Sequence, residues 1–350
     1  MIEDLVPPQF VPLADVQAGT EEELLAKDHV VGVALGYKSV GGRETDEPAL
    51  SVLVDTKLDP SLLSADDIVP STIDGSTTDV VEVGILHAGA TRTEQALRVD
   101  VPANGAATEP GQLPRSAFVP TFDTQALTVR MRPAMGGCSV GHFNVTAGTI
   151  ATGCYDSAAF PGIPPRFYLL SNNHVLANSN AASIGDPILQ PGKADGGVLP
   201  QDVIGRLARF QPIRFHAENP ASPPLNLIDA AIAEVPFQSL TREVYYIGYP
   251  KPPAQVAVGD VVQKTGRTTN YTTGRVQSVN ATVDVNFGGG RVARFARQIV
   301  TTNMSAPGDS GSLVLNLDNH AVGLLFAGSS AATIMNPIAF VTALLGIRIG

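Results

Sequence analysis

The stretch Ser305-Ala-Pro-Gly-Asp-Ser-Gly-Ser312 sets a serine among small residues in a turn-forming context. The neighbouring glycines let a substrate carbonyl approach the Ser310 hydroxyl. They also let the backbone amides of Gly308 and Ser310 converge on a developing oxyanion. The alternative hydrolase pattern Gly-x-Ser-x-Gly is not met, because position 312 is serine. Gly-Asp-Ser-Gly also forms ordinary loops, so this stretch alone leaves a nucleophile and a structural turn equally open.

A serine is a weak nucleophile without a general base, so the interpretation requires a histidine. His174 follows the apolar stretch 168–170, where the chain turns polar directly before the imidazole. The end of a strand would hold a base rigidly and let it reach a cleft. The other five histidines lie in less ordered sequence or, for His142, in a presumed hairpin where a structural role is expected; they are His29, His87, His142, His216 and His320.

Asp229 is the candidate for the third group, which must orient the imidazole and stabilise its charged form. It lies within the apolar run 227–233, where a carboxylate is costly to bury unless it has a partner. The other aspartates considered lie in polar, turn-rich sequence; they are Asp186, Asp195 and Asp202. The competing interpretation of Asp229 is a carboxylate that caps a nearby turn.

The order His174, Asp229, Ser310 is the chymotrypsin order. Residues 171–175, Ser-Asn-Asn-His-Val, resemble the histidine block of HtrA-like and glutamyl-endopeptidase-like bacterial proteases. Residues 227–232 resemble the aspartate block, and Pro-Gly-Asp-Ser-Gly-Ser resembles the nucleophile block. The resemblance covers roughly residues 116–350 and implies two six-stranded barrels with the triad in the cleft between them.

A narrower resemblance is to a trypsin-like branch with its own N-terminal domain, which includes bacterial proteins and the plant narrow-leaf proteins. It rests on residues 78–84, 172–178, 185–192 and 264–269. We therefore expect a mainly β protein, a chymotrypsin-like double β-barrel preceded by a small α+β domain. The expected divisions are an N-terminal domain with linker at 1–115, a first barrel at 116–245, and a second barrel with a C-terminal helix at 246–350.

Composition agrees with many short elements. The chain has 34 glycines and 27 prolines among 350 residues, and only 16% of its residues are charged, against about 25% usually. Short strands recur between Gly and Pro turns after residue 116. In the first domain we expect a helix that begins at Thr20, strands at 30–37, 50–55 and 79–86, and a linker at 89–115.

Substrate contacts follow from position relative to Ser310. Met304 is expected at the base of the pocket for the residue whose carbonyl is attacked (P1), with Ser305 beside it. Phe326, Ala327 and Gly328 are expected to offer an edge strand to the substrate backbone. No aspartate occupies the expected pocket base, so we expect a small or medium apolar P1 residue. Where many relatives have a serine near the buried aspartate, this chain has Phe326.

The two cysteines, Cys138 and Cys154, flank a presumed hairpin with its bend near residues 145–148. A symmetric hairpin would place them opposite each other and allow a disulfide. In a reducing compartment two buried thiols are expected instead.

The function predicted is serine endopeptidase; the alternative is a silent or latent protease fold that serves as a protein-interaction module. We expect a protein or peptide substrate and no metal or cofactor. The net charge of −10 argues against nucleic-acid binding, and no apolar run reaches the length of a membrane span. The first residues lack a signal-peptide pattern, so we expect a cytoplasmic protein, with homo-oligomerisation left open.

Overall fold

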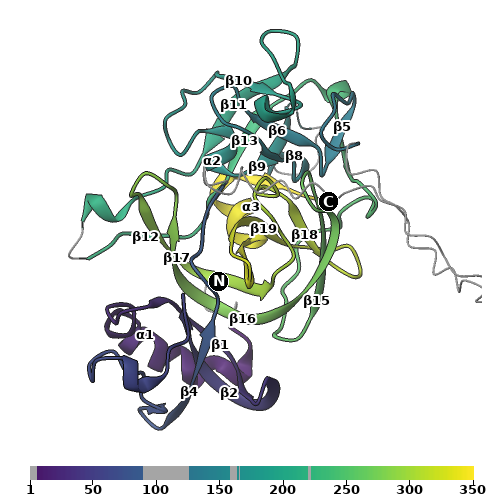
Figure 1. Cartoon of the computed structure of the whole chain (residues 1–350). Coiled ribbons are helices and arrows are strands. Elements are labelled where there is room, and N and C mark those ends of the chain that lie inside the picture. Colours follow the sequence, from purple (N-terminus) through teal and green to yellow (C-terminus); the bar gives the residue numbers. More distant parts are fainter. Residues whose placement is uncertain (1–5, 90–125, 158–163, 165, 220–221) are drawn as a thin grey trace, which may run out of the picture.

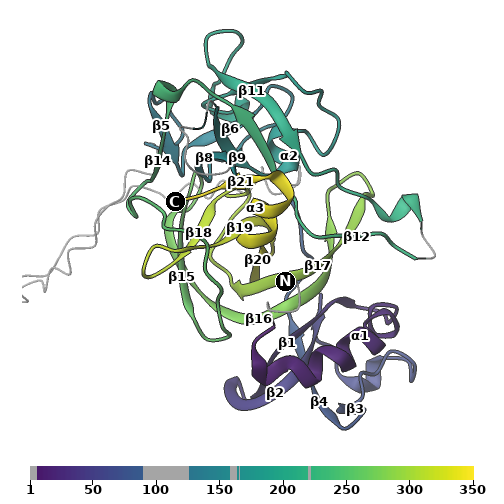
Figure 2. The same ribbon diagram turned by 180° about the vertical axis from the view of Figure 1, so that it is seen from behind.

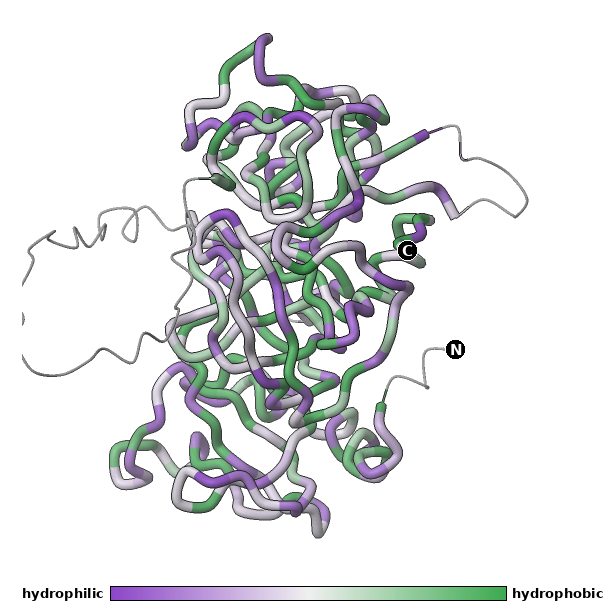
Figure 3. The backbone as a smooth tube through the Cα atoms, turned by 90° about the vertical axis from the view of Figure 1, so that its right-hand side faces the viewer, coloured by the Kyte–Doolittle hydropathy of each residue, from purple (hydrophilic) through white to green (hydrophobic). Residues whose placement is uncertain are grey.

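The computed structural model describes residues 6–89, 126–157, 164, 166–219 and 222–350. Most of the predicted linker at 89–115 lies outside these residues. The described chain is mainly β, with a helix-and-strand region at its N-terminal end, as predicted (Figure 1). Along the backbone tube of Figure 3, hydrophobic and hydrophilic stretches alternate over short distances, as short strands with one buried face require.

The first barrel is built on an eight-stranded sheet with the order β21-β8-β9-β13-β11-β10-β6-β7. Its interior is filled by aliphatic side chains such as Val140, Leu169 and Ile188, all fully buried. The strands are β6 (Ser139–His142), β7 (Gly148–Thr149), β8 (Thr152–Asp156), β9 (Phe167–Ser171), β10 (Pro187–Leu189), β11 (Val203–Phe210), β13 (Ala231–Glu234) and β21 (Ile347–Arg348). A separate pair, β5 (Ala134–Gly136) and β14 (Leu240–Val244), lies beside it.

The second barrel closes on itself, because β16 and β17 pair with each other as well as with the rest of their sheet. The ring runs β15-β16-β17-β20-β19-β18 and back to β15. These strands are β15 (Val261–Gly266), β16 (Asn270–Asn286), β17 (Val292–Thr302), β18 (Leu313–Asn316), β19 (Ala321–Gly328) and β20 (Ala332–Pro337). The short strand β12 (Leu225–Asn226) joins the edge of β17, and helix α3 (Ile338–Leu345) follows β20 as predicted.

The N-terminal region extends the sheet of the second barrel. Strand β1 pairs antiparallel with the long strand β16, with Gly32 opposite Val283, so eleven strands form one continuous sheet. Figures 1 and 2 show this region below the curve of β16. Its elements are α1 (Val11–Leu25), β1 (Val30–Val40), β2 (Arg43–Val54), β3 (Thr72–Ile73) and β4 (Ser76–Glu82). Single turns of 3-10 helix lie at Pro8–Phe10, Pro60–Leu62, Lys193–Asp195, His216–Glu218 and Phe237–Ser239.

The predicted start of the N-terminal helix was wrong. Helix α1 begins at Val11, with a proline in its first turn, and Thr20 lies in its interior, where its hydroxyl donates to the Val16 carbonyl at 2.7 Å. The early start buries Leu13 together with Leu24 and Leu25. Gln17 then reaches the barrel, donating to the Asn280 carbonyl at 2.9 Å.

A disulfide between Cys138 and Cys154 is not formed, and both thiols are free and buried. The hairpin is short: β6 pairs with β7, but β8 leaves it and pairs with β9 and β21. Cys138 therefore packs with Val140 and Leu169, whereas Cys154 packs in a different cluster with Leu170 and Ile228. The expectation of two buried thiols is the one that holds.

Burial makes both thiols poor nucleophiles. It raises the pKa of Cys138 to about 11 and raises the pKa of Cys154 further. Because the thiolate is the reactive form, we expect the folded protein not to react with dithionitrobenzoate at pH 8. After unfolding without reductant, the same reagent should titrate two thiols per chain; no thiols under those conditions would indicate a disulfide.

Candidate active site

His174 and Asp229 lie together at one edge of the first barrel. The short helix α2 (Asn173–Leu176) directly follows strand β9 and carries His174, while Asp229 lies between β12 and β13. The Asp229 carboxylate is fully buried. Its Oδ2 lies 2.5 Å from His174 Nδ1, and its Oδ1 accepts the His174 backbone N–H at 3.1 Å. The carboxylate thus fixes both the position of α2 and the orientation of the imidazole.

Polar side chains position the backbone of Asp229. The Asp229 N–H donates to Asn336 Oδ1 at 3.0 Å, and Asn172 Nδ2 donates to the Asp229 carbonyl at 2.7 Å. Phe326, which stands where a serine was considered, is fully buried and packs on Phe295 with ring centroids 4.7 Å apart. Among the described residues, only His174 donates a hydrogen bond to the carboxylate oxygens of Asp229.

Ser310 lies in the turn between β17 and β18, facing the first barrel. Gly308 and Gly311 both have positive φ, +101° and +97°. A Cβ on Gly311 would lie 2.1 Å from Ser171 Oγ, so only glycine fits this approach of the two barrels. Thr149 of β7 ties the turn to the first barrel: its N–H donates to the Ser310 carbonyl and its hydroxyl to the Gly308 carbonyl, both at 2.8 Å.

The amides of Gly308 and Ser310 donate no hydrogen bond to any residue that the structure describes. Their carbonyls are held by Thr149, so the turn is ordered while these two N–H groups stay available. Two free, fixed amides beside a serine hydroxyl have the chemistry of an anion-stabilising site.

A buried ion pair between Lys264 and Asp309 stabilises the turn that carries Ser310. Lys264 of β15 and Asp309 are both fully buried, and Lys264 Nζ lies 3.0 Å from Asp309 Oδ2. The carboxylate also accepts the amides of Thr268 and Ala306, at 2.9 and 3.0 Å. A Cβ on Gly266 would lie 2.4 Å from Asp309 Oδ1, so the glycine makes room for the carboxylate. Residues 264–269, Lys-Thr-Gly-Arg-Thr-Thr, thus supply the cation, a backbone donor and the space that the buried Asp309 carboxylate needs.

Lys264 was not identified from the sequence as a partner of Asp309. The lysine ammonium is a partner for Asp309 within the chain. The signal available was a lysine inside a strand-like stretch, Val261-Val-Gln-Lys264, where a buried cation needs an anion.

The His174 Nε2 atom is buried and has no hydrogen-bond partner among the described residues, so no hydrogen bond joins it to Ser310. Phe287 packs its ring edge-on against the imidazole, with centroids 6.1 Å apart. On another side lies Gly89, whose Cβ, if present, would be 3.9 Å from Nε2. The segment that leads out of the N-terminal region therefore reaches the imidazole.

A cavity of about 190 Å³ opens beside Ser310. Three of the residues that were predicted to contact substrate line it, namely Ser305, Ala327 and Gly328. Met304 does not: it is 4% exposed and packs in the barrel core, where its Sδ would meet a Cβ on Gly274 at 2.7 Å. Asn303 and Ser305 line the cavity, whereas the Met304 side chain between them packs into the core cluster that contains Val262 and Met335. Phe326 likewise turns its ring into the core.

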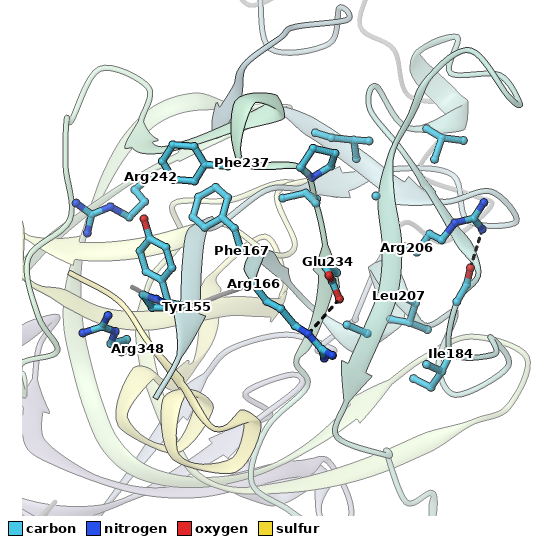
Figure 4. Close-up of a pocket in the computed structure, with 18 of the residues that line it drawn as sticks. Tyr155, Arg166, Phe167, Ile184, Arg206, Leu207, Glu234, Phe237, Arg242 and Arg348 are labelled. Carbon is cyan, nitrogen blue, oxygen red and sulfur yellow. Dashed lines mark hydrogen bonds and ion pairs between the residues drawn. The ribbon is translucent and has the colours of Figure 1, made fainter. Parts of the chain in front are cut away.

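A much larger cavity, about 1360 Å³, contains no residue of the His174–Asp229–Ser310 group. It lies where β9 begins and β13 ends (Figure 4). Arg166 and Glu234 point toward one another across it, 3.9 Å apart, and Tyr155 lies near Arg242 and Arg348 at one end. Neither the three candidate catalytic residues nor the free amides of Gly308 and Ser310 line this larger cavity, so its size alone does not make it the candidate site.

Two family models match the chain. Residues 151–324 match the trypsin-like peptidase domain, and residues 16–86 match the NARROW LEAF 1 N-terminal domain. The chain therefore carries a trypsin-like peptidase domain on a chymotrypsin-like double barrel. More narrowly, this peptidase domain is preceded by an N-terminal domain of the narrow-leaf type, which confirms both resemblances.

Curated relatives agree with this class. Serine protease 2 of Streptomyces fradiae is 44% identical over 75 residues, which are 21% of this chain and 34% of the relative. Glutamyl endopeptidase 2 of Streptomyces griseus is 33% identical over 102 residues, 27% of this chain and 50% of the relative. The chain thus spans between a third and a half of the length of these relatives. The structure of Thermobifida fusca Protease A is 16% identical with a TM-score of 0.43, covering 61% of this chain and 97% of that one.

No helix in the described part of the chain is long and apolar enough to cross a membrane.

Proposed function

We propose that this protein is a serine endopeptidase with His174, Asp229 and Ser310 as its catalytic triad. The observation that carries the proposal is the pair of free amides at Gly308 and Ser310, held in place by Thr149 and by the Lys264–Asp309 pair. An ordered turn with unused donors is unexpected in a loop that has only a structural role.

The proposed reaction begins when Ser310 Oγ attacks the carbonyl carbon of the substrate and its proton passes to His174 Nε2. The Asp229 carboxylate stabilises the imidazolium through Nδ1–H, and the two amides bind the oxyanion. The C–N bond then breaks, and the proton on Nε2 passes to the leaving amine. Water hydrolyses the Ser310 ester by the same route, with His174 again as the base, and releases the new carboxyl group.

The unpaired Nε2 is compatible with this reaction, because catalytic hydrogen bonds often shorten only when substrate is bound. The same observation also favours the alternative of a latent or silent protease fold used for protein interaction. A proteome-derived peptide library separates the two. We expect cleavage by the wild type and none by Ser310→Ala; intact peptides with both proteins would contradict the endopeptidase.

The pocket beside Ser310 bears on the residue preferred at P1. No carboxylate lines it among the described residues, so we do not expect cleavage after Lys or Arg. Its volume of about 190 Å³ fits a small or medium side chain. Cleavage sites from the same library report this preference directly.

An alkaline loss of activity follows from the proposed role of Lys264. Burial lowers the pKa of Lys264, although the Asp309 carboxylate opposes this shift. The ammonium is therefore lost at a lower pH than in an exposed lysine, which titrates near about 10.4. Deprotonation leaves Asp309 without its cation and loosens the turn. As the pH is raised, kcat/KM should therefore begin to decline before the pH at which an exposed lysine titrates. A plot of kcat/KM against pH that stays flat up to the pH at which an exposed lysine titrates would contradict the role of Lys264.

A further inference from the structure

The segment Gly84–Gly89, which leads out of the N-terminal region, lies against the end of strand β19. The His87 N–H donates to the Gly328 carbonyl and the Gly328 N–H donates to the His87 carbonyl, both at 3.0 Å. This is a complete antiparallel residue pair. A second anchor is the end of β16, where Ala88 N–H donates to the Asn286 carbonyl at 3.0 Å and Asn286 N–H to the Leu86 carbonyl at 2.9 Å.

The last residues of β19 extend from the turn that carries Ser310 to the cavity beside it. The Leu325 carbonyl accepts the Gly311 N–H at 2.8 Å, so Leu325 lies beside the turn that carries Ser310. Strand β18 pairs with β19 only up to Leu324, which leaves the edge beyond it without a barrel strand. An extended peptide whose carbonyl reaches Ser310 would add to this edge by strand pairing. Gly328 has one N–H and one carbonyl, and His87 occupies both.

The segment continues from His87 toward the reactive groups. His87 and Gly89 both line the cavity beside Ser310. Gly89 has φ +77°, and a Cβ on it would lie 3.7 Å from His174 Cδ2. This backbone is turned, so Gly89 is not in the extended conformation of a residue presented for attack. The segment therefore fills the position of a substrate without adopting its full conformation.

Anchoring is local. Leu86 is 1% exposed and packs in the cluster that contains Phe295 and Phe326, whereas Ile85 is 54% exposed. Ser329 Oγ donates to the Val83 carbonyl where the segment begins. A few backbone hydrogen bonds and one buried side chain hold the segment, so it can open without unfolding of the barrels.

We propose that Gly84–Gly89 is a built-in occupant of the peptide-binding edge, and that an extended peptide binds there only when this segment is displaced. The inference rests on the proposed function for its consequence, an autoinhibited protease, but the competition for Gly328 stands without catalysis. The opposing view is that the segment is a permanent strand and that substrates never use this edge.

The test uses full-length protein in the Ser310→Ala background and a fluorescent peptide that copies residues 81–89, Val-Glu-Val-Gly-Ile-Leu-His-Ala-Gly. His87→Pro removes the N–H that Gly328 binds, whereas the matched control His87→Ala keeps it and removes only the imidazole. We expect the peptide to bind the His87→Pro protein at least about tenfold more tightly, 1.4 kcal/mol, than the protein with native His87 or the His87→Ala control.

Equal affinities for the three proteins, or no binding to the His87→Pro protein, would overturn the proposal. If His87→Pro fails to fold, Ala88→Pro replaces it, because that change removes the donor to Asn286 and leaves His87 unchanged. Labelling of Ser310 by a small fluorophosphonate, measured on the same variants with Ser310 restored, reports on the proposed function. Its failure would exclude the protease and leave the peptide result valid.

Discussion

Replacing Lys264 by methionine should both destabilise the fold and silence Ser310. The change keeps the length of the side chain but leaves the Asp309 carboxylate buried without a cation. Removing one partner of a buried ion pair typically costs about 3–5 kcal/mol. The turn that fixes the Gly308 amide depends on the same carboxylate, so the rate of fluorophosphonate labelling should fall together with stability. Urea unfolding and labelling kinetics measure the two effects.

The control is the double variant Lys264→Met/Asp309→Asn, which removes both charges. An amide at position 309 can still accept the N–H groups of Thr268 and Ala306, so part of the unfolding free energy should return. If Lys264→Met alone unfolds at the same urea concentration as the wild type, the pair is not what orders this turn.

Asp229→Asn should lower kcat by about 10⁴-fold while the protein stays folded. The carboxylate accepts hydrogen from His174 Nδ1 at 2.5 Å, and an amide at this position no longer enforces the tautomer that leaves Nε2 free to take the serine proton. The backbone contacts of residue 229 with Asn336 and Asn172 do not involve the side chain and should remain. Steady-state kinetics on a peptide from the library gives kcat and KM separately.

The chain offers a matched control for this variant in a second His–Asp pair. His142 is buried and its Nε2 lies 3.1 Å from Asp186 Oδ2, and neither residue lines the cavity beside Ser310. Asp186→Asn should leave kcat within about twofold, because the ordinary effect of a change away from the site is small. A comparable loss in both variants would mean that Asp229 acts through general stability and not through His174.

The sequence predicted the barrels, and it singled out His174, Asp229 and Ser310 as candidates, because both inferences depend on local signals. Short strands separated by glycine turns can each be recognised from a short stretch of sequence. The same holds for His174, Asp229 and Ser310, because each lies in its own short motif. The structure places His174 against Asp229, although their sequence positions alone give no distance. It shows no hydrogen bond from His174 Nε2 to Ser310.

What could not be predicted depends on contacts between distant segments. His87 was set aside because its flanking sequence shows no ordered pattern, yet its importance comes from pairing with Gly328. Met304 was placed in the pocket by its offset from Ser310, but its side chain packs in the core with residues from other strands, such as Val262 and Met335. The alternative of a disulfide assumed that β6 and β8 pair, whereas β8 pairs with β9. Tertiary packing decides which strands pair, in what register, and whether a given side chain points into the core or toward the surface.

The most direct measurement of the central claim is covalent labelling with a small fluorophosphonate, followed by mapping of the modified residue by mass spectrometry. The endopeptidase account predicts one adduct per chain on Ser310, lost in Ser310→Ala and strongly slowed in Asp229→Asn. Correctly folded wild-type protein that acquires no adduct at Ser310, or acquires it equally fast in Asp229→Asn, would contradict the account.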